Sequence, residues 1–236
     1  MTLDTNAAWT ALTGSPVLDI AITVGCYQFG LWCYLRSGRK PFLLPVFVGF
    51  VLTAIAIFIL QRPVAAYLEG TQPMTVLLGP VTVALAVPLY ENLYLMARLW
   101  WPLLLMLVLT AISVCASTLW LADGFGASQA LSMSLAPKAA TTPIAILIAE
   151  AIGGYQGLAA VAVMLTGILG AMFGPSLLRR LGVTDDAALG FALGLSAHAV
   201  GTARGFEISK RCGAFAALGM SLMGLTLAIA LPLILA

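Results

Sequence analysis

The chain contains several stretches of about 20 residues that carry almost no charge, and these apolar runs limit its fold more than any other feature. A helix needs about 20 mainly apolar residues to cross a bilayer. Such runs cover residues 16–35, 41–60, 73–96, 100–122, 157–178 and 214–235. Two further runs, 128–152 and 185–207, contain polar residues. The sequence therefore predicts an all-α, polytopic transmembrane helical bundle with seven or eight spans.

Composition excludes most soluble classes of protein. Only 8% of the residues are charged, whereas a soluble domain carries about 25%. The net charge of +2 is too small to indicate a nucleic-acid partner. The loops between the runs are short, so residues 1–236 are expected to form a single transmembrane domain. No basic segment precedes the first run, which is expected to act as an uncleaved insertion signal.

The sequence shows no sign of an enzyme, a cofactor or a metal site. None of the four cysteines forms a CxxC pair, so neither zinc binding nor a disulfide framework is predicted. No paired carboxylates and no nucleophile with a base occur at a spacing typical of catalysis. The cysteines are interpreted as small buried apolar residues.

The basic residues indicate part of the membrane topology. Arg36, Arg39 and Lys40 lie between the first two runs and predict a cytoplasmic loop, with the N-terminus outside. If eight runs cross the membrane, Arg179 and Arg180 fall outside, against this rule. If the run 73–96 is a re-entrant hairpin, they return to the cytoplasm, and this version is preferred.

Proline interrupts the first of three unusual segments, residues 78–90. Pro80 and Pro88 each remove a backbone donor from a helix. The segment is either a broken element or a kinked helix, and both interpretations stay open. Irregular backbone at membrane depth requires surrounding protein or a cavity.

The second interrupted segment, residues 134–145, places a lysine inside an apolar run. Pro137 and Pro143 bracket Lys138, Thr141 and Thr142. A lysine at the centre of a bilayer costs about 2.5 to 3.5 kcal/mol on insertion scales. Lys138 either reaches an interface or faces a cavity, and the adjacent prolines and threonines favour the cavity.

The third interrupted segment, residues 194–207, contains the single histidine of the chain. Ser196, His198, Thr202 and Arg204 alternate with alanine and glycine residues that permit close packing. His198 is interpreted either as a packing residue or as a group that contacts substrate or carries a proton. Arg204 either binds a carboxylate or pairs with Glu207, three residues away.

Broken helices suggest one scheme for these segments. The N-terminus of a half-helix near the bilayer centre presents free N–H groups and a positive dipole end, which favour an anion. His198, Glu150 and Glu207 are the candidates for proton coupling. The predicted substrate-binding residues are Thr82, Lys138, Thr141, Thr142, Ser196, His198, Gly201, Thr202 and Arg204.

Four blocks of sequence resemble the LrgB/CidB family of bacterial inner-membrane proteins, which includes the plastidic glycolate/glycerate transporter of plants. The blocks are residues 77–90, 134–145, 165–170 with 174–175, and 196–204. The chain departs from the family pattern at Leu44, where asparagine often precedes the proline, and at Glu91-Asn92, where basic or amide residues are common. Neither departure affects Lys138, His198 or Arg204.

The resemblance implies a multi-pass protein of the bacterial inner membrane that transports small monocarboxylates such as glycolate, glycerate or pyruvate. Family members are also described as antiholin-like regulators of murein hydrolases, which makes a pore or pore modulator the alternative function. A smaller LrgA/CidA-type membrane protein is the expected partner. A homodimer is also expected, because a small moving bundle needs a stationary surface.

Overall fold

A computed structural model describes residues 15–77, 80 and 83–235, and every element in this part of the chain is a helix. Leu78, Gly79, Val81 and Thr82 lie outside the described residues, so part of the first interrupted segment and one predicted site residue, Thr82, are not placed. The chain divides into unit 1, Met1–Ala84, and unit 2, Leu85–Ala236. The single transmembrane domain stays a prediction.

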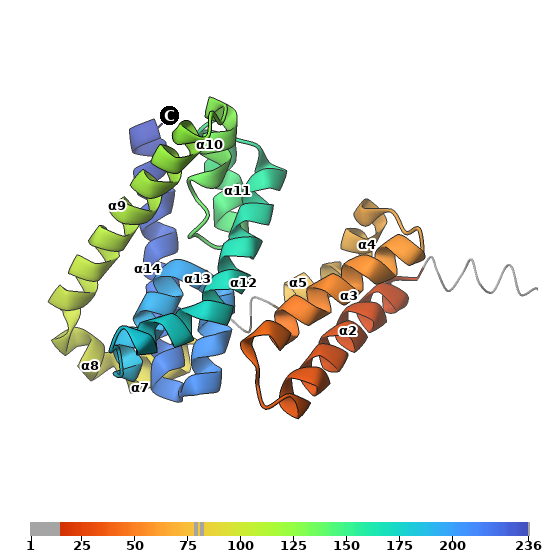
Figure 1. The fold of residues 1–236 in the computed structure, drawn as a ribbon, viewed down its shortest axis with the longest axis horizontal. Helices are drawn as coiled ribbons and strands as arrows, with labels where there is room; N and C mark the ends of the chain where they lie inside the picture. Colours follow the sequence, from red (N-terminus) through yellow and green to blue (C-terminus); the bar gives the residue numbers. More distant parts are fainter. Residues whose placement is uncertain (1–14, 78–79, 81–82, 236) are drawn as a thin grey trace, which may run out of the picture. The chain divides into compact units, whose positions relative to one another are not determined.

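Four helices in the described part are long and apolar enough to cross a membrane (Figure 1). They are α2 (Pro16–Arg36), α9 (Trp100–Gly124), α12 (Gln156–Arg180) and α14 (Lys210–Leu235). Their bounds lie close to the predicted runs. The chain is therefore a helical membrane protein, as predicted, while the count of seven or eight spans stays a prediction.

Unit 1 is built on a helical hairpin of α2 and α3 (Pro45–Ile59). Glycine allows the two helices to approach closely, because a Cβ atom on Gly30 would lie 3.0 Å from the carbonyl oxygen of Pro45. A short 3-10 helix, η1 (Pro41–Leu43), joins them, and α4 (Val64–Gly70) and α5 (Gln72–Val76) follow. With 15 residues, α3 is shorter than the predicted run, since its first turn begins only at Pro45.

Short helices replace the predicted run 73–96. Most of its described residues belong to α5 and then to α7 (Ala86–Glu91) and α8 (Leu93–Arg98) of unit 2. Asn92 separates α7 from α8, and its side chain donates to the carbonyl oxygen of Pro88 over 2.9 Å. No described part of this run forms a helix long enough to cross a bilayer.

The long helices of unit 2 run in alternating directions. Residues 108–119 around the middle of α9 and residues 226–235 at the C-terminal end of α14 line one apolar cavity of about 200 Å³. Figure 1 shows these two helices running the same way. α12 runs the opposite way and starts at the end of the unit where α14 finishes (Figure 1). α10 (Gln129–Leu135) and α11 (Thr142–Ala151) lie between α9 and α12 in the chain.

Helix α13 (Asp186–Ile208) folds back on itself rather than running straight. A straight helix of its 23 residues would be about 34 Å long. The hydroxyl of Ser209, directly after α13, instead donates to the carboxylate of Asp186 at its start, over 2.7 Å. The reversal occurs at His198, whose φ of 40° and ψ of −127° are not helical. α13 is therefore a hairpin of two half-helices.

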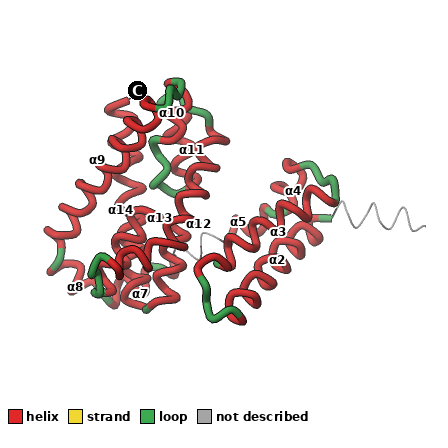
Figure 2. The backbone as a smooth tube through the Cα atoms, viewed as in Figure 1, coloured by secondary structure: helices red, strands yellow, loops and turns green. Residues whose placement is uncertain are grey.

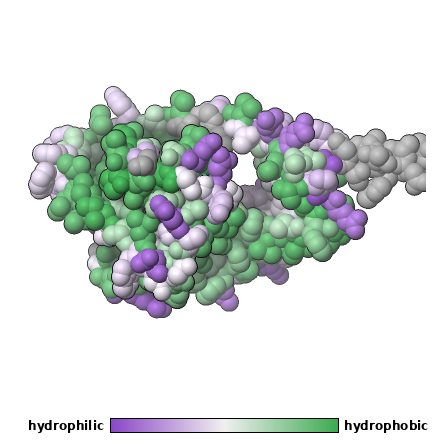
Figure 3. All heavy atoms as spheres, turned by 90° about the horizontal axis from the view of Figure 1, so that it is seen from above, coloured by the Kyte–Doolittle hydropathy of each residue, from purple (hydrophilic) through white to green (hydrophobic). Residues whose placement is uncertain are grey.

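Apolar side chains form the core of unit 2 and much of its surface. One buried cluster contains residues of the α10–α11 connection, such as Ala136 and Ala140, together with Phe191 and Leu195 of α13 and Phe215 of α14. Large apolar side chains are also exposed, including Trp120 at 75% and Leu233 at 80%. Figure 3 shows extensive apolar surface between a few hydrophilic patches, as expected for helices that face lipid.

Candidate functional site

The connection between α10 and α11 is irregular backbone, drawn as a loop in Figure 2, and its alanines are buried. Ala136, Ala139 and Ala140 are at most 1% exposed. The turn is held by backbone bonds such as Ala140 N–H to the Pro137 carbonyl oxygen, 2.9 Å. Gly154, at the far end of α11, packs against the backbone of Ser134, and the N–H of Tyr155 donates to the Ser134 hydroxyl over 2.6 Å. α10 and α11 therefore form a second hairpin.

Lys138 lies in this enclosed turn and is only partly exposed. Among the described residues its ammonium group has no hydrogen bond and no carboxylate within ion-pairing distance. An ammonium group in a low-dielectric setting is stabilised by an anion. The turn therefore presents an unneutralised positive charge.

The first turn of α11 adds hydrogen-bond donors beside Lys138. Thr141 occupies the N-cap position, yet its side chain makes no capping bond, and Pro143 stands within the first turn. The N–H groups of a first helical turn have no partner within the helix, and together with the dipole they favour an anion. Lys138, Thr141 and Thr142 therefore lie together in this turn, and their role in substrate binding stays a prediction.

His198 forms the tip of the α13 hairpin and is 3% exposed. Its Nε2 atom lies 2.9 Å from the carbonyl oxygen of Val163 on α12. A carbonyl oxygen only accepts, so Nε2 carries a proton and Nδ1 is the atom that can bind a second one. Gly167 makes room for the ring, because a Cβ atom there would lie 2.8 Å from Nε2. His198 therefore joins the hairpin tip to α12.

The other predicted residues of α13 serve mainly the hairpin itself. Ser196 donates to the carbonyl oxygen of Ala192 over 2.7 Å, and Thr202 donates to that of His198 over 2.9 Å. Gly201 lies against the first half-helix, since a Cβ atom there would lie 2.8 Å from that of Ala197. These contacts stabilise the tip, and they place its polar groups beside the break.

Both hairpin tips lie at the same depth, halfway along the long helices. Ile144, in the first turn of α11, packs against Gly224 of α14. A Cβ atom added at Gly224 would lie 3.0 Å from Cδ1 of Ile144. The Thr202 hydroxyl lies 3.8 Å from the sulfur of Met220, also in the middle of α14. Val163 and Gly167, which hold His198, lie near the middle of α12. No hydrogen bond joins the two groups of described site residues, but Ala139 and Ala140 in the first turn and Leu195 before the second tip belong to one buried apolar cluster.

Arg204, Glu207 and Glu150 lie away from the tips. Arg204 pairs with Glu207 one turn before the end of α13. This ion pair within one helix is the alternative to carboxylate binding that the sequence left open. Glu150 is exposed in the last turn of α11. Thr82 lies outside the described residues. The described part of the chain contains no group of three metal-ligating side chains.

Unit 1 holds a polar cluster that the sequence interpretation missed. Asp19 of α2 is fully buried, and Arg62, after α3, donates to both its oxygens from Nε and Nη2, each over 2.7 Å. Gly70 covers the carboxylate so closely that a Cβ atom would collide with it. The sequence did contain a signal for this pair, because Asp19 lies inside the first apolar run and Arg62 directly follows the second apolar run.

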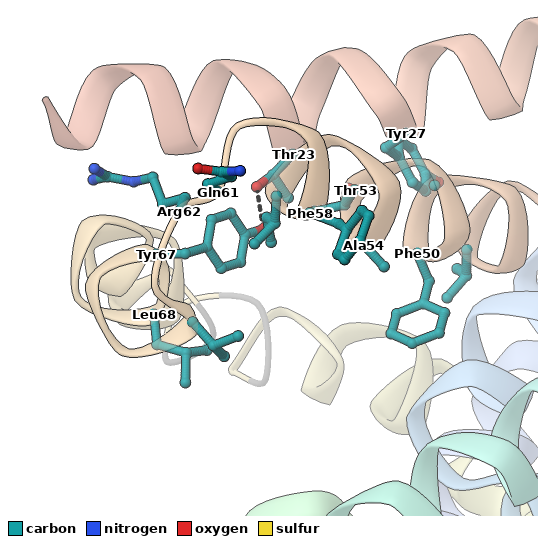
Figure 4. Close-up of a pocket in the computed structure, with 14 residues that line it drawn as sticks. Thr23, Tyr27, Phe50, Thr53, Ala54, Phe58, Gln61, Arg62, Tyr67 and Leu68 are labelled. Atoms are coloured by element: carbon teal, nitrogen blue, oxygen red, sulfur yellow. Dashed lines mark hydrogen bonds between the residues drawn. The ribbon is translucent and has the colours of Figure 1, made fainter. Parts of the chain in front are cut away.

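A cavity of about 840 Å³ adjoins this cluster within unit 1. In Figure 4, Thr23 and Tyr67 point toward one another beside it, and Phe50, Ala54 and Phe58 form an apolar wall. Thr23 donates its proton to the carbonyl oxygen of Asp19 over 2.7 Å. Tyr67 must therefore be the donor in the 2.6 Å bond between the two hydroxyl groups.

Comparison with known proteins assigns the chain to a family. The model of the LrgB-like family matches residues 23–236. The chain belongs to the LrgB-like family. This LrgB-like protein is 32% identical over 209 residues to an uncharacterized protein of Haemophilus influenzae, covering 87% of this chain and 90% of the relative.

Other relatives extend over nearly the whole LrgB-like chain. The uncharacterized protein YxaC of Bacillus subtilis is 32% identical over 206 residues, covering 87% of this chain and 89% of the relative. The antiholin-like protein LrgB of Bacillus mycoides is 28% identical over 223 residues, covering 94% and 97%. No solved structure matches the LrgB-like protein.

Proposed function

We propose that this protein is a secondary transporter of small monocarboxylates of the glycolate, glycerate and pyruvate class. The single observation that carries the proposal is Lys138, an ammonium group without a carboxylate partner among the described residues, beside the first turn of α11. A carboxylate bound there would accept from Lys138, Thr141 and the N–H groups of α11. The site lies at mid-depth, where an anion needs such partners.

The two hairpins supply the scaffold for alternating access. We propose that α10–α11 and α13 are re-entrant, each entering and leaving on one side, so that their tips meet near the bilayer centre. His198 at the α13 tip is the proposed proton carrier, through Nδ1. Ser196, Gly201 and Thr202 line the break beside it. Arg204 is a weaker ligand in this proposal than the sequence suggested, because Glu207 already engages it.

The names of relatives support a second function, and support it more directly than the first. The antiholin-like proteins of Bacillus match 94% of this chain. In this alternative the protein modulates a membrane pore that controls murein hydrolases and cell lysis. The hairpins would then be structural elements of a larger assembly.

Both functions imply the same setting. We propose a multi-pass protein of the bacterial inner membrane that catalyses no reaction and uses no cofactor. A homodimer and an LrgA/CidA-type membrane protein are the proposed partners. The family name supports the LrgA/CidA-type partner.

Uptake by proteoliposomes separates the two functions. Purified protein would be reconstituted and supplied with radiolabelled glycolate, pyruvate or lactate, with and without an inward proton gradient. A transporter gives saturable uptake of an acid without leakage of a trapped dye. Dye leakage without saturable uptake would contradict the transport function and support the pore function. Co-reconstitution with the LrgA/CidA-type protein tests whether a partner is required.

A further inference from the structure

The two ends of unit 2 differ sharply in charge. At the first end, α12 finishes, α9 and α14 begin, and both ends of α13 meet (Figure 1). At the second end, α9 and α14 finish, α12 begins, and the α10–α11 hairpin opens. The charged side chains near the first end are Arg98, Arg179, Arg180, Arg204, Lys210, Arg211, Glu91, Asp185, Asp186 and Glu207. The described residues near the second end carry only two charges, those of Asp123 and Glu150.

Contacts confirm that the charges of the first end lie together. Arg211 of α14 donates to the carboxylate of Asp185 over 3.0 Å. Leu178 of α12, beside Arg179, packs against the buried cluster of Leu189 in α13 and Cys212 in α14. Residues from three different helices therefore share one face.

Most acidic groups of this face are already engaged by protein. Asp185 accepts from the N–H groups of Ala187 and Ala188 as well as from Arg211. Asp186 accepts from Ser209, and Glu207 pairs with Arg204. Among the described residues Arg179, Arg180 and Lys210 form no such ion pair. We call these three side chains the basic rim.

We propose that the basic rim lies at the cytoplasmic leaflet and binds the headgroups of anionic phospholipids. Short basic segments next to spanning helices remain on the cytoplasmic side. That leaflet also attracts basic residues through its negative surface charge. The opposite end of unit 2, with no lysine or arginine among its described residues, then faces outside.

This orientation gives each hairpin a side. The α13 hairpin, with His198 at its tip, opens to the cytoplasm. The α10–α11 hairpin, with Lys138, opens to the outside, and the C-terminus of α14 also lies outside. The inference does not depend on transport, because it follows from charge placement alone.

Labelling of single cysteines tests the orientation in cells. In a full-length chain with its four cysteines replaced by serine or alanine, Lys210→Cys and Gln156→Cys mark the two ends. A membrane-impermeant maleimide is expected to label Gln156→Cys in intact cells and Lys210→Cys only after permeabilisation. The reverse pattern would overturn the proposal.

Photolabelling tests the lipid contact. Purified protein in nanodiscs would be exposed to photoactivatable phosphatidylglycerol or phosphatidylcholine, and labelled peptides mapped. Phosphatidylglycerol should label peptides around Arg179 and Lys210 preferentially. Each basic residue at an anionic surface contributes about fivefold in affinity, so Arg179→Gln/Arg180→Gln should lower this labelling roughly tenfold or more.

A charge-conserving variant serves as the matched control. Arg179→Lys/Arg180→Lys should keep the phosphatidylglycerol labelling, because the attraction depends on charge. Equal labelling by the two lipids, or labelling of the glutamine variant at the level of the unmodified protein, would overturn the lipid contact even if the orientation holds.

Discussion

The hydroxyl of Ser209, just after α13, donates a 2.7 Å hydrogen bond to the carboxylate of Asp186 at the start of α13, 23 positions earlier in the chain. This bond shows that α13 returns to the end from which it started. The reversal places His198 at a buried tip, where it contacts α12. Two such hairpins, with tips at one depth, define the candidate site.

Removal of the Ser209 hydroxyl should loosen the base of the α13 hairpin. A hydrogen bond to a charged group contributes about 1.5 to 3 kcal/mol, so Ser209→Ala should lower the thermal unfolding temperature of the purified protein. Ser221→Ala is the matched control, because that hydroxyl bonds only to Ala217 within its own helix. Equal unfolding temperatures for the two variants would contradict the closing role of Ser209.

Substitution of His198 should reverse the usual ranking of alanine and glycine. In a helix interior, glycine is about 1 kcal/mol less favourable than alanine. At His198 the φ of 40° favours glycine. His198→Gly should therefore unfold at a higher temperature than His198→Ala, and Ala199→Gly should show the ordinary destabilisation. A lower unfolding temperature for His198→Gly than for His198→Ala would contradict a helix reversal at this residue.

Gly167 should tolerate no side chain, because the ring of His198 occupies its Cβ position. Gly167→Ala should displace the hairpin tip and reduce carboxylate uptake by proteoliposomes. Gly157→Ala on the same helix has open space around its Cβ position and should leave uptake unchanged. Similar uptake by both variants would show that the contact between His198 and α12 is dispensable.

The Asp19–Arg62 pair should show strong coupling between its two members. Loss of one partner leaves the other charge without compensation, whereas loss of both does not. Arg62→Ala should thus lower the unfolding temperature more than Asp19→Ala/Arg62→Ala does. If the decrease in unfolding temperature of the double variant equals the sum of the decreases of the two single variants, the pair makes no coupled contribution to stability.

The sequence predicted the long helices well and the long-range contacts poorly. The runs near α2, α9, α12 and α14 are marked by apolar composition, which is a local property. Pro137 and Pro143 likewise predicted a break, because proline acts on its own backbone. The reversal at His198 depends on partners in other elements, such as Val163, and no spacing pattern in the sequence indicates them.

The candidate site was predicted only in part for the same reason. Lys138, Thr141 and Thr142 are neighbours in the chain, so their grouping followed from sequence. Arg204 was expected at the anion, but it pairs with Glu207 at helical spacing. The Asp19–Arg62 pair joins residues 43 apart, a distance at which the two charges gave separate, weak signals.

Stabilisation by ligand tests the central claim, that a carboxylate binds beside Lys138. A ligand that binds only the folded state stabilises it by about 2.7 kcal/mol at 100 times its Kd. Pyruvate or glycolate should raise the unfolding temperature of the unmodified protein and of Lys210→Gln, which loses a charge elsewhere, but should leave Lys138→Gln unchanged. An equal rise in Lys138→Gln would contradict the site.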